Sequence, residues 1–163
     1  MRERIWYELT QAKHNQLYCM FSLAYKRKVL NIFNMIILGF SSAGIMGWAF
    51  WKDFPLISCV IVSGISLLRL LSPHLIPSDK QIDKVDEITD FYFDYFNKLE
   101  FLWFDFETKK INEEQLKTQF YKIKNSEKKI NKNVNEIFKS NNKKLTNKAE
   151  IESNNYLTRT FNL

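Results

Sequence analysis

Two apolar stretches decide the fold: residues 29–51, VLNIFNMIILGFSSAGIMGWAFW, and residues 54–68, FPLISCVIVSGISLL. The first contains no charged residue, and only Lys52 and Asp53 separate it from the second. An α-helix needs roughly 20 apolar residues to cross the hydrocarbon core of a bilayer. The sequence therefore predicts a hairpin of two membrane spans, at about residues 29–51 and 54–72.

The apolar hairpin lies between two polar regions, so we expect an all-α membrane protein with three parts. The parts are an N-terminal amphipathic helix over residues 1–28, the transmembrane hairpin over 29–76, and long cytoplasmic helices over 77–163 that form a helical bundle in an oligomer. Basic residues 26–28 precede the first span, and positively charged flanks stay in the cytoplasm. We therefore expect a multi-pass protein of the bacterial inner membrane with both termini in the cytoplasm.

A cleaved signal peptide is the alternative interpretation of the first apolar stretch. The apolar core of a signal peptide is about 7–15 residues long. The stretch here is longer, and 28 residues precede it. Its length favours an uncleaved membrane helix.

The chain offers little for catalysis or metal binding. It lacks the motifs GxGxxG, GxxxxGK[ST], HExxH and GxSxG, so we expect no enzyme and no cofactor. Cys19 and Cys59 do not form a disulfide framework, and with His14 and His74 they lack the spacing of metal ligands. We interpret both cysteines as free thiols.

Residues 1–28 repeat apolar side chains at helical spacing. The positions on the shared face are Ile5, Leu9, Ala12, Gln16, Cys19 and Leu23. This amphipathic helix is expected either to lie along the inner leaflet or to continue into the first span.

A long helix is predicted after the second span. Pro73 and Pro77 are expected to end that span, and Ser78 and Asp79 supply helix-start side chains. From there to about Lys109 a seam repeats in steps of three and four. Its members are Ile82, Val85, Thr89, Tyr92, Phe96, Leu99, Trp103 and Phe106.

The seam is unusually aromatic, and a helix that is apolar over so much of its circumference packs against several partners. We therefore expect five of its side chains to pack copies of the chain together: Tyr92, Phe96, Leu99, Trp103 and Phe106. A second helix is predicted from Asn112 to about Lys139, and a last one from about Thr146 to Arg159.

Charge is sorted along the chain. Residues 79–108 hold nine acids and three lysines, a net charge of −6, whereas residues 109–148 hold twelve lysines and four glutamates, a net charge of +8. An antiparallel pair of the acidic and the basic helix is the simplest interpretation. Asp86, Asp90 and Asp94 form an acidic stripe that suits either a divalent cation or, more often, the lysines of the next helix.

Polar side chains inside the predicted spans are the candidates for a pore. The candidate pore-lining residues are Asn31, Asn34, Ser41, Ser42, Ser58, Ser66 and Arg69. Two interpretations stay open: the stripes are packing faces between helices, or one of them lines an aqueous path. Arg69 either reaches the headgroups or forms a ring at a pore mouth that favours anions.

Basic side chains are the candidates for ligand binding. They are Lys26, Arg27, Lys28, Lys122, Lys124, Lys128, Lys129 and Lys132. The lysine-rich helix is either a solvated face that balances the acidic helix or an anion-binding surface for a nucleotide or short nucleic acid, with Tyr121 available for stacking.

The architecture resembles the SLATT family. The stretches that carry the resemblance are AYKRKVLNIFNMIILGFSSAG (24–44), WKDFP (51–55), LEFLWFDFETKKI (99–111) followed by a new helix, and NKAEIESNNYLTRTFNL (147–163). The resemblance covers most of the chain and rests on architecture more than on invariant motifs.

The resemblance implies an oligomeric membrane pore or ion channel, for which we take a tetramer. Such a protein would be an effector of a bacterial antiphage system that depolarises the membrane and arrests growth. Short stand-alone members resemble the effectors of Hailong-type systems, in which a partner nucleotidyltransferase makes single-stranded DNA oligomers that hold the channel silent. The alternative is a non-conducting membrane-anchored scaffold that recruits a cytoplasmic partner.

Overall fold

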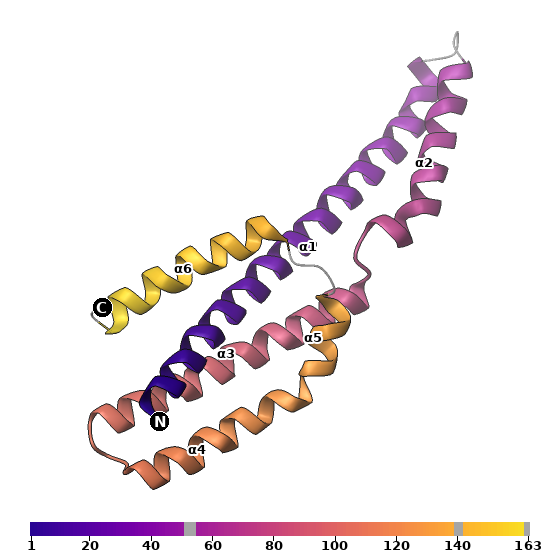
Figure 1. Ribbon diagram of the computed structural model, residues 1–163. Helices are drawn as coiled ribbons and strands as arrows, with labels where there is room; N and C mark the ends of the chain where they lie inside the picture. The colour runs from indigo at the N-terminus through magenta and orange to yellow at the C-terminus, as the bar shows by residue number, and fades with distance from the viewer. Residues whose placement is uncertain (51–54, 139–141, 162–163) are drawn as a thin grey trace. The chain divides into compact units, whose positions relative to one another are not determined.

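The computed structural model describes the backbone of residues 1–50, 55–138 and 142–161, without the side chains of residues 40, 42–50, 55–58, 61 and 73–75. Every element in these ranges is helical (Figure 1). The elements are α1 (Arg2–Phe50), α2 (Pro55–Leu75), α3 (Asp79–Glu107), α4 (Glu113–Ser126), the short 3₁₀ helix η1 (Glu127–Lys129), α5 (Asn131–Ile137) and α6 (Lys143–Phe161).

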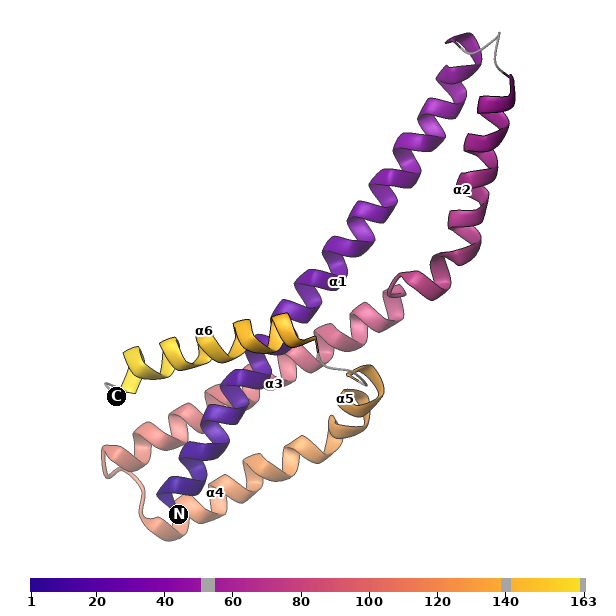
Figure 2. The same cartoon turned by 45° about the horizontal axis from the view of Figure 1, so that its top comes forward.

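The chain divides into two compact units. The bundle unit consists of Met1–Leu23 and Asp83–Leu163, and the hairpin unit consists of Ala24–Ile82. In the hairpin unit, α2 runs back alongside the second half of α1, as Figures 1 and 2 both show. In the bundle unit, α4 returns along α3 in the opposite direction, which agrees with the antiparallel pair predicted from the charges.

The prediction of two membrane spans is wrong for the part of the chain that the structure describes. None of the described helical segments is both long and apolar enough to cross a bilayer. α1 is one continuous helix of 49 residues. The charged residues of its first 28 positions, ending with Lys26, Arg27 and Lys28, directly border the apolar residues that follow.

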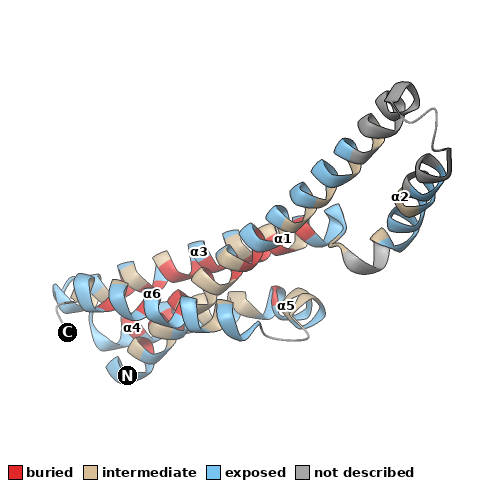
Figure 3. Ribbon diagram, turned by 90° about the horizontal axis from the view of Figure 1, so that it is seen from above, coloured by how far each residue is buried: buried red, intermediate tan, exposed pale blue. Residues whose placement is uncertain are grey.

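The core of the bundle unit forms where the stripe of α1 meets the seam of α3. Ile5, Leu9 and Ala12 are buried on α1, and Val85 and Leu99 are buried on α3. Figure 3 shows the buried positions gathered on the inward faces of the bundle helices. The predicted stripe over residues 1–28 is thus confirmed as an apolar face, and its partner is the rest of the bundle unit.

The aromatic seam is occupied within one chain. Tyr92, Phe96 and Leu99 are buried in the core, and Trp103 and Phe106 are half-buried against it. The prediction that these five side chains pack copies together is therefore corrected, because α1, α4 and α6 already cover them. The pattern of apolar residues predicts how much of a helix surface is apolar, but it does not predict which other helix covers that surface.

Two helix ends follow local chemistry that the sequence predicts. Asn112 Oδ1 accepts a hydrogen bond from the Gln115 amide at 2.9 Å, and Gln115 Oε1 accepts one from the Asn112 amide at 3.1 Å. This capping box starts α4. Ser78 and Gln81 exchange the same pair of bonds at the start of α3, both at 3.3 Å.

The end of α3 places a lysine where glycine is usual. The Lys109 amide donates to the Phe106 carbonyl at 3.0 Å, and the Lys110 amide donates to the Asp105 carbonyl at 2.9 Å. This is the hydrogen-bond pattern of a Schellman motif. Lys109 has a φ of 58°, a left-handed conformation that disfavours any residue with a Cβ.

The single helix predicted from Asn112 to about Lys139 is interrupted. α4 ends at Ser126, η1 follows, and α5 begins at Asn131. The run from 124 to 129 contains no apolar residue, so no apolar side chain of this turn packs into the core. Ile130 is buried directly after the turn and brings the chain back to the bundle.

In the hairpin unit, α2 continues past Pro73. The prediction that Pro73 ends this helix is therefore wrong. A proline has no amide hydrogen, so the Arg69 carbonyl loses its usual helical donor. The Ser72 hydroxyl donates to that carbonyl at 2.8 Å. The helix therefore extends to Leu75, two residues before Pro77.

Candidate functional site

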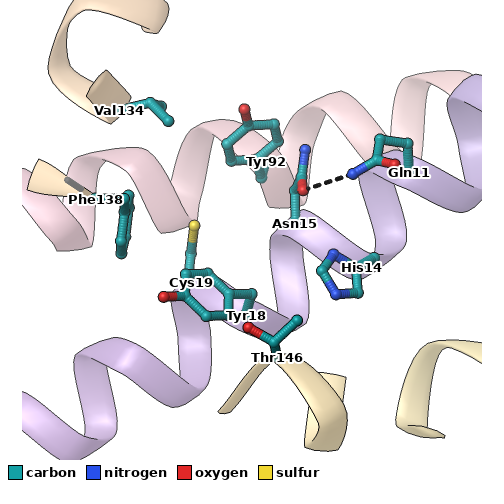
Figure 4. A pocket seen from close by; sticks show the side chains of 9 residues that line it. All are labelled: Gln11, His14, Asn15, Tyr18, Cys19, Tyr92, Val134, Phe138 and Thr146. Carbon is teal, nitrogen blue, oxygen red and sulfur yellow. Dashed lines mark hydrogen bonds between the residues drawn. The ribbon is translucent and has the colours of Figure 1, made fainter. Parts of the chain in front are cut away.

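The bundle unit contains a cavity of about 210 Å³ between four helices. Figure 4 shows its walls, which come from α1, α3, α5 and the beginning of α6. The lining residues are Gln11, His14, Asn15, Tyr18, Cys19, Tyr92, Val134, Phe138 and Thr146. The wall combines polar neutral side chains with aromatic rings, and we call it the α1 cavity.

One side of the α1 cavity is a second stripe on α1. Gln11, Asn15 and Tyr18 follow one another at helical spacing, next to the buried apolar stripe. The Gln11 side-chain amide donates to Asn15 Oδ1 at 3.1 Å. The Tyr18 hydroxyl accepts a bond from the Asn142 amide at 3.3 Å, which ties the start of α6 to the cavity wall.

Burial keeps two titratable groups of the cavity, Cys19 and Tyr92, neutral. Burial raises the pKa of the Cys19 thiol from 9.0 to about 12, so Cys19 is a poor nucleophile at neutral pH. Burial also raises the pKa of the Tyr92 phenol, and the negative charge of Glu127 adds to the effect. The cavity therefore offers hydrogen bonding and packing, with no activated nucleophile at these two groups.

A charged cluster lies in the bundle unit around Glu8. The Lys124 ammonium contacts Glu8 Oε1 at 2.6 Å and Glu127 Oε2 at 2.9 Å, and the Tyr95 hydroxyl donates to Glu8 Oε1 at 2.8 Å. Burial acts to lower the pKa of Lys124, but the bonds to both carboxylates outweigh it, so that pKa is raised. Burial and the bond to Glu8 raise the pKa of Tyr95.

Lys124 differs from the other predicted ligand-binding lysines because it belongs to this cluster. Its ammonium is committed to Glu8 and Glu127, whereas Lys122, Lys128 and Lys129 are exposed. Lys132 on α5 is exposed as well. We call these four exposed lysines the basic face. Tyr121 beside it accepts a hydrogen bond from Arg4 at 2.9 Å, and Arg4 also lies over its ring.

The other predicted basic residues belong to the hairpin unit. Arg27 and Lys28 are exposed on α1, and Lys26 is half-buried. Burial lowers the pKa of Lys26. The structure thus places the two predicted groups of cations in different units.

The predicted pore-lining residues are mostly exposed on the hairpin unit. Asn31 and Asn34 on α1 and Ser66 and Arg69 on α2 are exposed, and Ser41 is half-buried. The Ser66 hydroxyl donates to the Val62 carbonyl of its own helix at 2.9 Å. The side chains of Ser42 and Ser58 lie outside the described residues.

Asn34 borders a groove of the hairpin unit. The groove measures about 330 Å³. Its walls come from α1 and from the segment that ends α2 and begins α3: Leu30, Phe33, Asn34, Ser72, Ile76, Pro77, Ser78 and Asp79. Of the predicted polar residues, Asn34 is therefore the one that the structure places at a described recess.

The acidic stripe of α3 does not gather metal ligands. Among the described residues, no group of three or more His, Cys, Asp and Glu side chains is arranged to hold a metal ion. One ion pair between α3 and α5 has the reverse polarity of the prediction, since Lys84 on α3 contacts Glu136 on α5 at 2.9 Å. Asp105 near the end of α3 contacts Lys110 at 3.4 Å, which is the predicted polarity.

Sequence reasoning missed Glu8 and the polar wall of the α1 cavity. Glu8 is one of two acids in residues 1–28 and lies next to the buried stripe, which is a usable signal for a buried ion pair. The stripe of Gln11, Asn15 and Tyr18 has the same helical spacing as the apolar face. It was detectable as a second face, but its partners on α3, α5 and α6 were not.

Comparison of the chain with protein-family models, with curated proteins and with solved structures gives no match.

Proposed function

We propose that the protein is a homo-oligomeric effector of a bacterial antiphage system that permeabilises the inner membrane. One observation carries the proposal: the hairpin unit exposes large apolar side chains along both of its helices. These side chains are Ile32, Met35, Ile36, Leu38, Val60, Val62, Leu67, Leu68, Leu70 and Leu71.

Such a surface is unfavourable in water. Transfer of apolar surface out of water contributes roughly 25 cal/mol per Å², and large exposed apolar patches mark sites that bind membranes or other proteins. Among the described side chains of the hairpin unit, only Ile82 is buried. The described side chains of the unit form no interior that covers these groups, so lipid and further copies of the chain are the partners that we propose.

The proposal rests on this exposed surface and does not require any single helix to cross a bilayer. Polar side chains lie among the apolar ones, including Asn31, Asn34 and Arg69. When hairpins associate, polar groups on facing helices pair with one another or with water, because unpaired polar groups are costly in an apolar medium. A water path along these groups would depolarise the membrane.

The bundle unit is the regulatory part in this proposal. The basic face has four exposed cations that suit a nucleotide or a short single-stranded DNA oligomer. The resemblance to the SLATT family supports this assignment, because a partner nucleotidyltransferase supplies such a signal to similar effectors. Control by the ligand requires that it bind the closed and open assemblies with different affinity.

Liposome experiments test the proposal with the full-length protein. We expect it to float with liposomes of bacterial lipids and to release an entrapped dye. Leu70→Glu and Met35→Glu should abolish flotation and release, since each puts a charge on a side chain that is 73% exposed in the hairpin unit. Phe101→Glu is the matched control, because Phe101 is 72% exposed in the bundle unit.

Two outcomes would contradict the proposal. Wild-type protein that stays in the aqueous fraction and releases no dye would remove the membrane as its target. Equal loss of release in the Phe101→Glu variant would show that the hairpin surface is not the part responsible.

The second candidate function is a non-conducting scaffold at the membrane that recruits a partner. The basic face favours it, since exposed lysines on one segment also suit an acidic protein surface. This function predicts flotation without dye release. It also predicts that reversal of Lys128 and Lys129 to glutamate abolishes capture of the partner and leaves flotation intact.

A further inference from the structure

The α1 cavity has a lining that selects against charge. Its nine lining residues include no Asp, Glu, Lys or Arg among the described side chains. A charged group moved from water into such a cavity loses its hydration without an opposite charge to replace it. The lining therefore favours a molecule without net charge, which sets this cavity apart from the basic face.

His14, a wall residue of the cavity, has a buried ring nitrogen without a partner. Its Nδ1 makes no hydrogen bond with any described residue. An unpaired buried polar atom is unfavourable, so a small rotation of the His14 ring that brings Nδ1 to a donor or acceptor of a bound molecule is favourable.

Flat rings shape the walls. The rings of His14 and Tyr18 are nearly parallel, with centroids 6.5 Å apart and an interplanar angle of 11°. Phe138 meets Tyr18 edge-on at 5.4 Å. Figure 4 shows these rings around the same space as the side-chain amides of Gln11 and Asn15. Aromatic walls beside amide groups suit a planar molecule with both a ring face and polar edges.

The size of the cavity suits a small occupant. It measures about 210 Å³, and a single-ring heterocycle is a suitable occupant for a recess of this size.

We propose that the α1 cavity binds an uncharged, planar, single-ring heterocycle that carries an amide or lactam group. His14 and the side-chain amides of Gln11 and Asn15 bond the polar edge, and Tyr18 and Phe138 contact the ring. This site is independent of the proposed membrane function, and its test measures binding alone.

The test uses the full-length protein and two probes of nearly equal shape, nicotinamide and nicotinate. Saturation-transfer NMR and thermal unfolding report binding, with uracil as a second neutral probe. We expect nicotinamide and uracil to bind and to raise the unfolding temperature, and nicotinate to bind at least about tenfold more weakly. Absence of binding by both neutral probes, or equal binding of nicotinate, would overturn the proposal.

Variants locate the site. His14→Phe keeps the aromatic ring and removes the unpaired nitrogen, and we expect it to weaken nicotinamide binding about tenfold. Gln16→Leu is the matched control, because Gln16 Oε1 is the other buried unpaired side-chain atom among the described residues and Gln16 does not line the cavity. Unchanged binding in His14→Phe, or equal loss in Gln16→Leu, would place the molecule elsewhere. Should His14→Phe fail to fold, Thr146→Val is expected to weaken binding, and full affinity in that variant would also contradict the site.

Discussion

The two units of this chain bury their apolar residues in opposite ways. In the bundle unit, Leu9, Leu99 and Phe120 are fully enclosed by other helices. In the hairpin unit, Leu38 and Leu70 are more than two-thirds exposed. Apolar side chains therefore form a closed interior in one unit and an open surface in the other. Four facing helices can enclose a core, whereas two cannot.

The largest expected difference between the units concerns truncation of an apolar side chain. Phe96→Ala should lower the free energy of unfolding of the bundle unit by about 3–5 kcal/mol, since Phe96 is buried and its removal leaves a cavity. Met35→Ala in the hairpin unit should change it by no more than about 0.5 kcal/mol. Urea unfolding followed by amide hydrogen exchange in α3 measures both.

Equal effects of these two substitutions would contradict the contrast between the two units. They would mean that the side chain of Met35 is enclosed in solution, whereas the structure exposes it.

Alkaline pH should act on the bundle unit with the next largest effect. Cys19 and Tyr95 are neutral when protonated, and their pKa values in the folded chain are raised above 9.0 and 10.0, respectively. The stability that they contribute is fully present below pH 9 and is lost as pH rises toward the folded values. From pH 9 to pH 11 we expect Cys19 alone to remove about 2 kcal/mol.

The measurement is the free energy of unfolding by urea at steps of pH. Cys19→Ala should flatten the curve above pH 9, because the alanine side chain has no proton to lose. A variant as sensitive to alkali as the wild type would show that the Cys19 thiol is not enclosed.

A third expected effect distinguishes Lys124 from the basic face. Lys124→Met leaves Glu8 and Glu127, whose side chains are 12% and 18% exposed, without their cation. We expect a loss of about 1–2 kcal/mol at pH 7, reduced from the value for a fully buried pair because Lys124 is itself 37% exposed. Lys128→Met should have no measurable effect on stability and should weaken binding of a DNA oligomer.

Those outcomes would distinguish a lysine that stabilises the fold from a lysine that binds a ligand. A stable Lys124→Met variant would mean that Glu8 is hydrated in solution and that the Glu8 cluster does not hold α1 to α4.

The smallest expected effect is a gain. Lys109→Gly should stabilise the bundle unit by up to about 1 kcal/mol, because glycine adopts the positive φ at this position without the Cβ clash of lysine. Lys110→Gly is the control and should bring no gain. Thermal unfolding of the two variants side by side gives the sign, and a loss in Lys109→Gly would show that the helix end of α3 differs in solution.

Much of the bundle unit was predictable because its signals are local. The stripe over residues 1–28 and the seam of α3 repeat at three and four residues, a period set by the backbone of a single helix. The capping residues Ser78 and Asn112 act within one turn. The helix break at 127–130 and the continuation of α2 through Pro73 were missed. The break follows a run without apolar residues, 124–129, and the continuation accompanies a hydrogen bond from the Ser72 hydroxyl to the Arg69 carbonyl.

The two membrane spans were the main error, and they arose from composition without context. Among the described residues, no helix is both long and apolar enough to cross a bilayer, and α1 joins the first apolar run to a charged segment that belongs to the bundle unit. The candidate polar residues of the hairpin were identified by type, but only Asn34 lies at a described groove.

The sequence by itself determined where helices begin, which face of each is apolar, and how charge is divided along the chain. Only the tertiary structure decided what covers those faces. Lys124 and Glu8 lie 116 positions apart in the sequence, and the α1 cavity joins residues of four helices. The reason is physical: helix formation depends on neighbours within one turn, whereas partners and cavities depend on how whole helices fill space together.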